Sequence, residues 1–216
     1  MKIIKAEKFG KSHVKILFDD SNQITLAYEI FLKHQLKLKQ GISQAVLSQI
    51  VREDQEYSVR QSALGYIARR HHSKNEIRIK LKQKKFDGEL IEQTLDQLEQ
   101  KKYIDDNSFA RAFTDEKIKT RNWGRIKIKS ELIKRGISTN IIEEIIQEKF
   151  SGESEIEAGL ELAAKKLRKI KNRKFESDKV KSNIFSFLIS RGYNYDACKK
   201  IFSLLFKDED LNNIYS

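Results

Sequence analysis

Four histidines and one cysteine are the residues best suited to metal binding or nucleophilic chemistry in this 216-residue chain. His71 and His72 are adjacent, so on a helix they would point to different faces, and they lack the i, i+4 spacing of a helical metal site. His13 and His34 stand alone elsewhere in the sequence. The spacing therefore predicts no metal site and no bound cofactor.

The paired carboxylates Asp105-Asp106 and Glu143-Glu144 have simpler roles than acid–base catalysis. An aspartate just before an apolar helical pattern caps the helix and favours the positive end of its dipole. The glutamate pair fits a solvated helix face. The sequence has no glycine-rich phosphate loop and no serine in a nucleophile-elbow context. We therefore predict no catalytic residue and no enzymatic activity.

Positive charge is the chemistry that remains, and it is unevenly distributed. The chain carries 43 Lys and Arg against 31 Asp and Glu, a net charge of +12. Residues 69–85 hold eight of the cations against Glu76, and residues 117–135 hold eight against Glu131. The segments that follow, 86–99 and 136–148, contain only acidic charges. This alternation suits a polyanionic partner such as nucleic acid, or a filament with acidic grooves or bound DNA.

An internal repeat organises these charges. Leu90, Ile91, Thr94 and Leu95 form an apolar stripe of helical period, which returns 51 residues later as four isoleucines. A further 56 residues on, the equivalent positions are Ala197, Cys198, Ile201 and Phe202. Cys198 therefore occupies a core position, and packing rather than nucleophilic chemistry is its expected role. Each module of about fifty residues fits three helices.

Local signals place the elements ahead of and inside the first module. Alternating apolar residues on both sides of residues 19–22 predict a small β-hairpin, with Ile3-Ile4 as a further candidate strand. Phe31, Leu32, Leu36 and Leu38 suggest a short helix closed by Gly41. Ser43 is a candidate N-cap for a long helix that runs towards residue 71. The spacing of Ser73 and Glu76 is that of a capping box, and a helix should begin near residue 74.

Two basic stretches, 77–82 and 126–129, alternate with period two and fit either a strand or a helix. The capping box, the lack of turn residues and the Ile77/Leu81 spacing favour helices. Trp123 lies between the basic clusters, where it could stack on a nucleotide base or fill a helix junction, and the second role is simpler. The absence of proline, which costs a helix interior about 3 kcal/mol, agrees with a nearly all-helical chain.

We therefore predict a mostly α protein, a tandem array of three three-helix, helix-turn-helix-like modules preceded by a small β-hairpin and a short helix. The expected boundaries are 1–42 for the hairpin and short helix, 43–104, 105–150 and 151–208 for the modules, and 209–216 for a polar tail. No run approaches the roughly 20 apolar residues that span a bilayer, and no signal peptide is recognisable at Met1. A single cysteine fits a reducing, cytoplasmic location.

Four linked motifs resemble the signature of the RecX regulatory proteins. These are Ala63-Leu64-x-Tyr66-Ile67-Ala68-Arg69-Arg70, Ser73-x-x-Glu76-Ile77-Arg78-x-Lys80-Leu81, Tyr103-Ile104-Asp105-Asp106-x-x-Phe109-Ala110-Arg111 and Gly124-x-x-x-Ile128-x-x-Glu131-Leu132-x-x-Arg135-Gly136-Ile137. The resemblance is strong over residues 60 to about 146 and weaker in the third module. Where the family usually has a glycine before Phe86, this chain has Lys85, so the first inter-helix turn should use a different cap.

The resemblance implies a bacterial cytoplasmic regulator that binds RecA and RecA filaments on DNA and modulates, usually by inhibition, their recombinase, ATPase and coprotease activities. It implies no catalysis and no cofactor. An array capped by a hairpin has no evident need of a second copy, so we expect a monomer. The alternative is an autonomous DNA-binding protein that contacts phosphates directly.

Both interpretations use the same candidate surface, a basic edge built from the cationic runs and from the arginines of the family pattern. Its residues are Arg69, Arg70, Arg78, Lys80, Lys82, Arg111, Arg121, Arg125, Lys127, Lys129 and Arg135. The motifs alone do not separate the residues that contact a partner from those that brace neighbouring modules.

Overall fold

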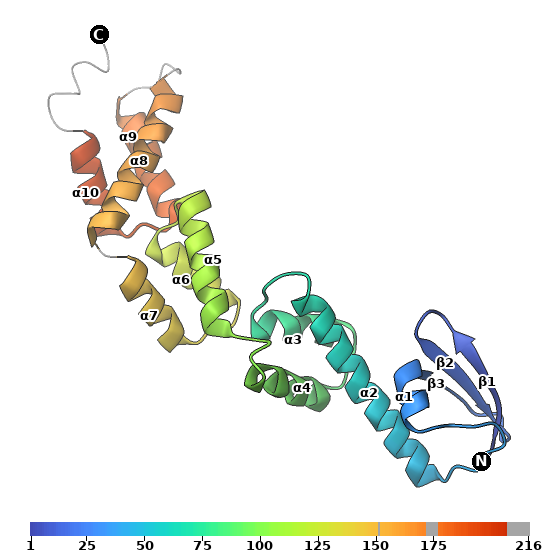
Figure 1. Ribbon diagram of the computed structural model, residues 1–216. Coiled ribbons are helices and arrows are strands. Elements are labelled where there is room, and N and C mark those ends of the chain that lie inside the picture. Colours follow the sequence, from blue (N-terminus) through green and yellow to red (C-terminus); the bar gives the residue numbers. More distant parts are fainter. Residues whose placement is uncertain (151, 172–176, 207–216) are drawn as a thin grey trace. The chain divides into compact units, whose positions relative to one another are not determined.

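The computed structural model describes residues 1–150, 152–171 and 177–206, and it divides into two compact units, 1–104 and 105–216 (Figure 1). Position 151, residues 207 and 208 and the predicted tail 209–216 lie outside the described residues. Among the helices described, none is long and apolar enough to cross a membrane.

Unit 1 begins with a three-stranded antiparallel sheet, β1 Ile3–Phe9, β2 His13–Phe18 and β3 Gln23–Ala27, in the order β1-β2-β3. The central strand places Ile16 opposite Ala6 and Ile24, and its alternating residues Val14, Ile16 and Phe18 are buried. The predicted hairpin and the additional strand around Ile3 are therefore confirmed.

The short helix α1 spans only Tyr28–Lys33, so the predicted continuation through Leu36 and Leu38 is wrong. Gln35 adopts a left-handed conformation with φ 48°, which ends the helix. Leu36 is still buried against the sheet, whereas Leu38 is exposed. Leu36 is therefore a buried loop residue rather than part of a helical stripe.

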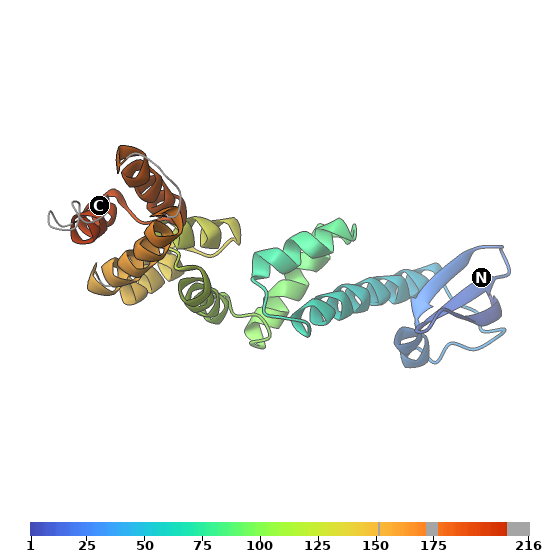
Figure 2. The ribbon, with the colours of Figure 1, turned by 90° about the horizontal axis from the view of Figure 1, so that it is seen from above.

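The long helix α2, Gln44–Ile67, joins the sheet to the first helical module (Figure 2). As predicted, Ser43 caps it, accepting a hydrogen bond from the Val46 amide at 3.3 Å. Its first half contributes Ile50 to the core beneath the sheet, and its second half contributes Val59 and Ala63 to the next core. One helix thus belongs to two hydrophobic clusters.

The first module is completed by α3, Lys74–Gln83, and α4, Gly88–Gln100. The Ser73 hydroxyl accepts from the Glu76 amide at 3.1 Å, so the predicted helix start is confirmed. The period-two stretch is helical because Ile77 and Leu81, four residues apart, are both fully buried. Its alternation reflects lysines on the solvated faces rather than a strand.

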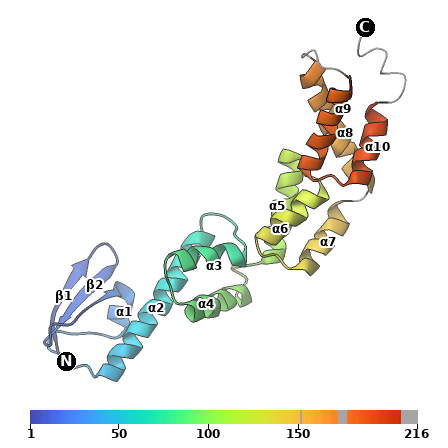
Figure 3. The ribbon, with the colours of Figure 1, turned by 180° about the vertical axis from the view of Figure 1, so that it is seen from behind.

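Unit 2 contains α5 Asp106–Arg121, α6 Arg125–Lys134 and α7 Thr139–Lys149, followed by α8 Gly152–Lys171, α9 Ser177–Arg191 and α10 Tyr195–Leu205. Asp105 caps α5 through the amides of Asn107 and Ser108, as predicted. One core lies within α5–α7, and a second lies among α8, α9 and α10, which cluster together (Figure 3).

Candidate partner-binding surface

An ion pair recurs at equivalent positions of the first two modules. Arg78 of α3 donates from Nε and Nη2 to the two carboxylate oxygens of Glu92 on α4, at 2.7 and 2.9 Å. The equivalent positions of the second module, 51 residues later, are Lys129 and Glu143, which also bond to each other. The pair ties the second helix of each module to the third. Arg78 also holds the pKa of Glu92 below its ordinary value through its hydrogen bonds.

The third module replaces this ion pair with an aromatic cluster. The equivalent positions are Phe185 and Lys199, a further 56 residues along. The Phe185 ring lies edge-on to Tyr195 at 5.7 Å and to Phe202 at 6.4 Å between centroids. In this module, aromatic contact therefore ties the second helix to the third, as the ion pair does in the other two modules.

Arg111 and Arg125 are also engaged inside unit 2. Arg111 of α5 bonds to Glu144 and Glu148 on α7, and the bond to Glu148 lowers the pKa of that carboxyl group. Arg125, at the start of α6, donates from Nε to Glu155 on α8 at 2.7 Å and from Nη2 to the Phe150 carbonyl at 3.1 Å. Because the Glu155 side chain is only 3% exposed, this contact is a buried brace between the second and third modules.

A cation near the end of each middle helix lies over an aromatic ring. Lys84, Arg135 and Arg191 are equivalent by the same offsets. They lie 5.6 Å from the Tyr66 centroid, 4.4 Å from that of Phe113 and 5.1 Å from that of Phe187, respectively. At these distances the ring quadrupole attracts the cation. Sequence reasoning missed Lys84 and Arg191, although the repeat offset from Arg135 would have found both.

These contacts divide the predicted basic edge into two groups. Six of its members bond to carboxylates within the chain and act as braces, namely Arg70, Arg78, Arg111, Arg125, Lys129 and Arg135. The other five have no carboxylate within 4.0 Å among the described residues, namely Arg69, Lys80, Lys82, Arg121 and Lys127. Arg69, Lys80 and Lys82 belong to unit 1, and Arg121 and Lys127 belong to unit 2.

Two of the five unbraced cations are oriented by aromatic side chains. The Lys80 ammonium lies 5.2 Å from the Tyr66 centroid, and that of Lys127 lies 5.7 Å from the Trp123 centroid. Trp123 is half-buried and packs against Phe113 at 6.2 Å, so it fills the helix junction as predicted. Arg69, Lys82 and Arg121 are exposed. These five side chains keep a positive charge available for an external anionic group.

His72 and Cys198 have structural roles. His72 is buried, its Nδ1 lies 2.9 Å from the Arg70 carbonyl, and burial lowers its pKa. Cys198 is fully buried in the core of the third module, which raises its pKa to about 11. Within the described part of the chain, no three His, Cys, Asp or Glu side chains are grouped as metal ligands.

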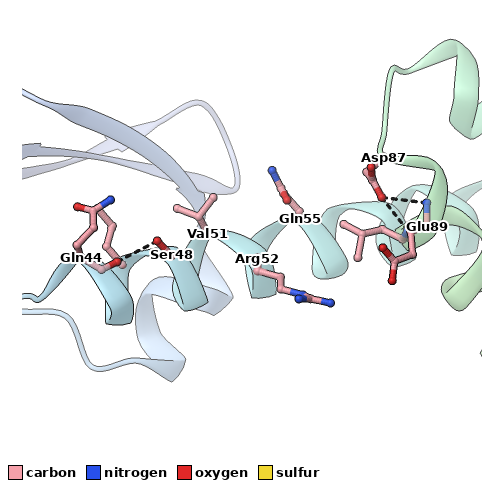
Figure 4. A pocket seen from close by; sticks show the side chains of 9 residues that line it. Gln44, Ser48, Val51, Arg52, Gln55, Asp87 and Glu89 are labelled. Atoms are coloured by element: carbon pink, nitrogen blue, oxygen red, sulfur yellow. Dashed lines mark hydrogen bonds between the residues drawn. The ribbon is translucent and has the colours of Figure 1, made fainter.

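A surface groove of about 520 Å³ lies within unit 1, between α2 and the start of α4 (Figure 4). Leu47, Val51 and Leu90 supply its apolar lining. Among its polar groups, Asp87 accepts from the Glu89 and Leu90 amides at 2.9 and 3.1 Å. Arg52 pairs with Glu56 at 3.4 Å. Asp87 therefore caps α4 and Arg52 forms an ion pair within α2, and these contacts do not define a reactive centre.

Repeated three-helix domains, held together by internal ion pairs, define a helical-repeat protein. Family comparisons agree with this class. Residues 60–98 match the first three-helix domain of RecX, residues 105–146 the second and residues 153–202 the third. The chain belongs to the RecX family of regulatory proteins, as its motifs predict.

Curated relatives support the same assignment, and solved structures support the fold. The regulatory protein RecX of Clostridium acetobutylicum is 31% identical over 209 residues, which cover 96% of each chain. That of Clostridium botulinum strain Eklund 17B is 28% identical over 198 residues, 92% of each chain. A crystal structure of regulatory protein RecX matches with a TM-score of 0.69 at 22% identity, covering 93% of this chain and 98% of that one. RecX from Lactobacillus salivarius gives 0.63 at 23% identity, covering 71% and 97%. The predicted fold class is confirmed.

Proposed function

We propose that this protein binds RecA and RecA filaments on DNA and inhibits recombinase, ATPase and coprotease activity, acting as a monomer in the cytoplasm without catalysis of its own. The observation that carries the proposal is the division of the basic edge. In both of the first two modules, internal carboxylates neutralise part of the edge and leave other cations exposed. Selective pairing of this kind fits a surface that must keep its shape while it presents charge to a partner.

Repetition adds affinity for a repeating partner. A filament offers identical subunits at regular intervals, and tandem modules that each carry contact residues engage neighbouring subunits as one molecule. After the first module binds, the second binds at a high effective concentration. The contact residues in this proposal are Arg69, Lys80, Lys82, Arg121 and Lys127, while the six braced cations maintain the modules.

The direct test is the ATPase rate of RecA on single-stranded DNA, measured at near-physiological salt while this protein is titrated in below the RecA concentration. Action on filaments predicts a substoichiometric fall in rate. If the rate falls only when enough protein is present to cover the DNA, competition for phosphates is the correct account, and filament binding is not.

Charge reversal tests the proposed surface. The triple change Lys80→Glu, Lys82→Glu and Lys127→Glu should abolish ATPase inhibition, because it reverses the charge of three proposed contact residues. The fold should be kept, because none of the three pairs with a carboxylate among the described residues. The matched control, Lys101→Glu, Lys199→Glu and Lys200→Glu, changes the net charge equally outside the basic edge and should inhibit like the wild type. Full inhibition by the first variant would contradict the electrostatic proposal.

The net charge of +12 also favours a second candidate, direct DNA binding through phosphate contacts. Affinity for duplex DNA should then fall with salt with a log–log slope of about −0.9 per phosphate contacted. A steep slope without RecA, together with inhibition that appears only at DNA-saturating concentrations, would favour this candidate.

A further inference from the structure

A second surface lies outside the three family-matched domains, in the N-terminal part of unit 1. It is a groove of about 480 Å³ between the sheet and α1. Ala6 and Val14 line it from β1 and β2, and Tyr28 and Phe31 line it from α1. This volume lies within the range of small-ligand sites, roughly 300–1,000 Å³. None of the residues that line this groove belongs to the basic edge of the helical modules.

The sheet register and the short helix explain why the groove exists. Lys8 pairs with Val14 and Ala6 with Ile16, so these residues share the face of the sheet that carries the core. The Tyr28 amide donates to the Ser12 carbonyl at 2.9 Å, which fixes the start of α1 beside the β1–β2 turn. The small Ala6 side chain leaves space between this face and the helix.

Two aromatic rings form the apolar wall contributed by α1. The Tyr28 and Phe31 rings are nearly parallel, with an interplanar angle of 16° and centroids 6.5 Å apart. Tyr28 is 49% exposed, although it lines a groove, and Phe31 is half-buried. An aromatic ring exposed to this extent offers a stacking surface to another flat group.

The rim of the groove is cationic. Lys8 and Lys11 are exposed, and no carboxylate lies within 4.0 Å of either ammonium among the described residues. The acidic member of the lining, Glu7, pairs with Lys5 at 2.6 Å. Residues 1–41 contain eight lysines and four acidic residues, so the surrounding domain also attracts anions.

We propose that this groove binds single-stranded nucleic acid, with a base stacked on Tyr28 and the adjacent phosphates held by Lys8 and Lys11. Aromatic platforms flanked by cations bind single strands with little sequence preference, because every base has a flat π-face and every linkage carries a negative charge. An acidic peptide would use the lysines but would leave the ring face without a flat partner. Nucleic acid therefore fits more of the groove.

The test is fluorescence anisotropy of a labelled oligothymidylate with the full chain, without RecA, across a salt series. Tyr28→Ala should weaken binding about fivefold or more, the loss expected for one stacked base. Lys8→Glu with Lys11→Glu should weaken binding and make the log–log salt slope shallower by about 1.4, since each phosphate contact on a single strand contributes about 0.7. The matched control is Lys37→Glu with Lys39→Glu, which makes the same charge change elsewhere in the N-terminal domain.

An abasic oligonucleotide separates stacking from general charge attraction. It should bind the wild type more weakly than oligothymidylate does, and Tyr28→Ala should cause no further loss with it. Equal binding of oligothymidylate by wild type and Tyr28→Ala, or equal weakening by the two lysine pairs, would overturn the proposal. So would an equally charged acidic peptide that binds the wild type but not the groove variants while oligothymidylate binds all of them equally, which would assign the groove to peptides. Thermal denaturation of every variant verifies folding, and RecA inhibition is measured separately, so either proposal can fail alone.

Discussion

Lys85 shows how one residue departs from the repeat without changing the backbone. It has φ 63°, and the equivalent residues of the other modules, Gly136 and Gly192, have φ 74° and 89°. A non-glycine residue in this left-handed conformation costs roughly 1–2 kcal/mol. The prediction of a different cap at this turn is therefore wrong. The turn has the same left-handed conformation as in the other modules, but a lysine occupies the position of the glycine.

Lys85→Gly should stabilise unit 1 by about 0.5–1 kcal/mol, since relief of the left-handed strain exceeds the extra chain entropy of the unfolded state. Urea denaturation measures the change. Lys82→Gly, the same substitution within α3, is the control and should destabilise by about 1 kcal/mol. Equal effects at the two positions would show that the φ angle does not matter here.

Cys198 provides a prediction about pH. Burial, with a smaller contribution from the charge of Glu155, raises its pKa to about 11 from an ordinary value of 9.0. The folded state therefore retains a proton that the unfolded state loses above about pH 9, so this contribution to the free energy of unfolding is full below that pH and is lost as the pH rises towards 11.

Native protein at pH 8 should accordingly react with a thiol reagent such as DTNB far more slowly than urea-unfolded protein, because Cys198 is both protonated and inaccessible. Comparing the two reaction rates on the same preparation checks this. Rapid modification of the native protein, at a rate near that of the unfolded chain, would place the thiol at the surface.

At the scale of elements, the start of α6 is capped by groups from the third module. The Gly124 amide donates to the Arg191 carbonyl at 2.9 Å, and the Ile126 amide to the Gly192 carbonyl at 3.0 Å. The Arg125 amide donates to Glu155 at 3.3 Å. A β-carbon on Gly124 would lie 2.5 Å from the Gly192 carbonyl oxygen, so glycine permits this close approach. The second and third modules thus satisfy each other's backbone groups.

Glu155→Ala should destabilise unit 2 by about 2–3 kcal/mol, because it leaves Arg125 without its carboxylate and an N-terminal helix amide without its acceptor. Hydrogen exchange should accelerate at residues 124–126 before it does so in the cores. Glu157→Ala, an exposed change on the same helix, should leave both the stability and the exchange near wild type. An unchanged exchange rate in Glu155→Ala would rule out the brace.

At the scale of the whole molecule, the division at residues 104 and 105 separates complete hydrophobic cores. Ile104 is buried in the core of the first module, and Asp105 caps the first helix of unit 2. The cores beneath the sheet and in the first module belong to unit 1, and those of the second and third modules belong to unit 2. Each unit therefore contains the apolar contacts needed to fold independently.

Fragments 1–104 and 105–216 should each unfold cooperatively, as measured by thermal circular dichroism, and each should give dispersed amide signals in NMR spectra. A mixture of the fragments should show the sum of the two transitions. If either fragment lacks a cooperative transition, its core depends on the other unit, and the division does not represent independent folding.

The sequence by itself determined the repeat, most helix starts and the family. Apolar periodicity and caps such as Ser73 and Asp105 are local, because they depend on residues within one or two helical turns. The end of α1 was not predictable in this way, since Leu36 is buried by tertiary contact in a segment that is not helical. Local pattern cannot distinguish a buried loop residue from a helical one.

Only the tertiary structure decided which cations are braces. Arg78 meets a carboxylate 14 residues away, Arg125 one 30 residues away and Arg111 one 37 residues away. Such contacts depend on how helices pack, whereas the sequence presents all these side chains as similar members of a basic run. The groove beside Tyr28 likewise could not be predicted from the sequence, because it arises from strand register and from the short length of α1.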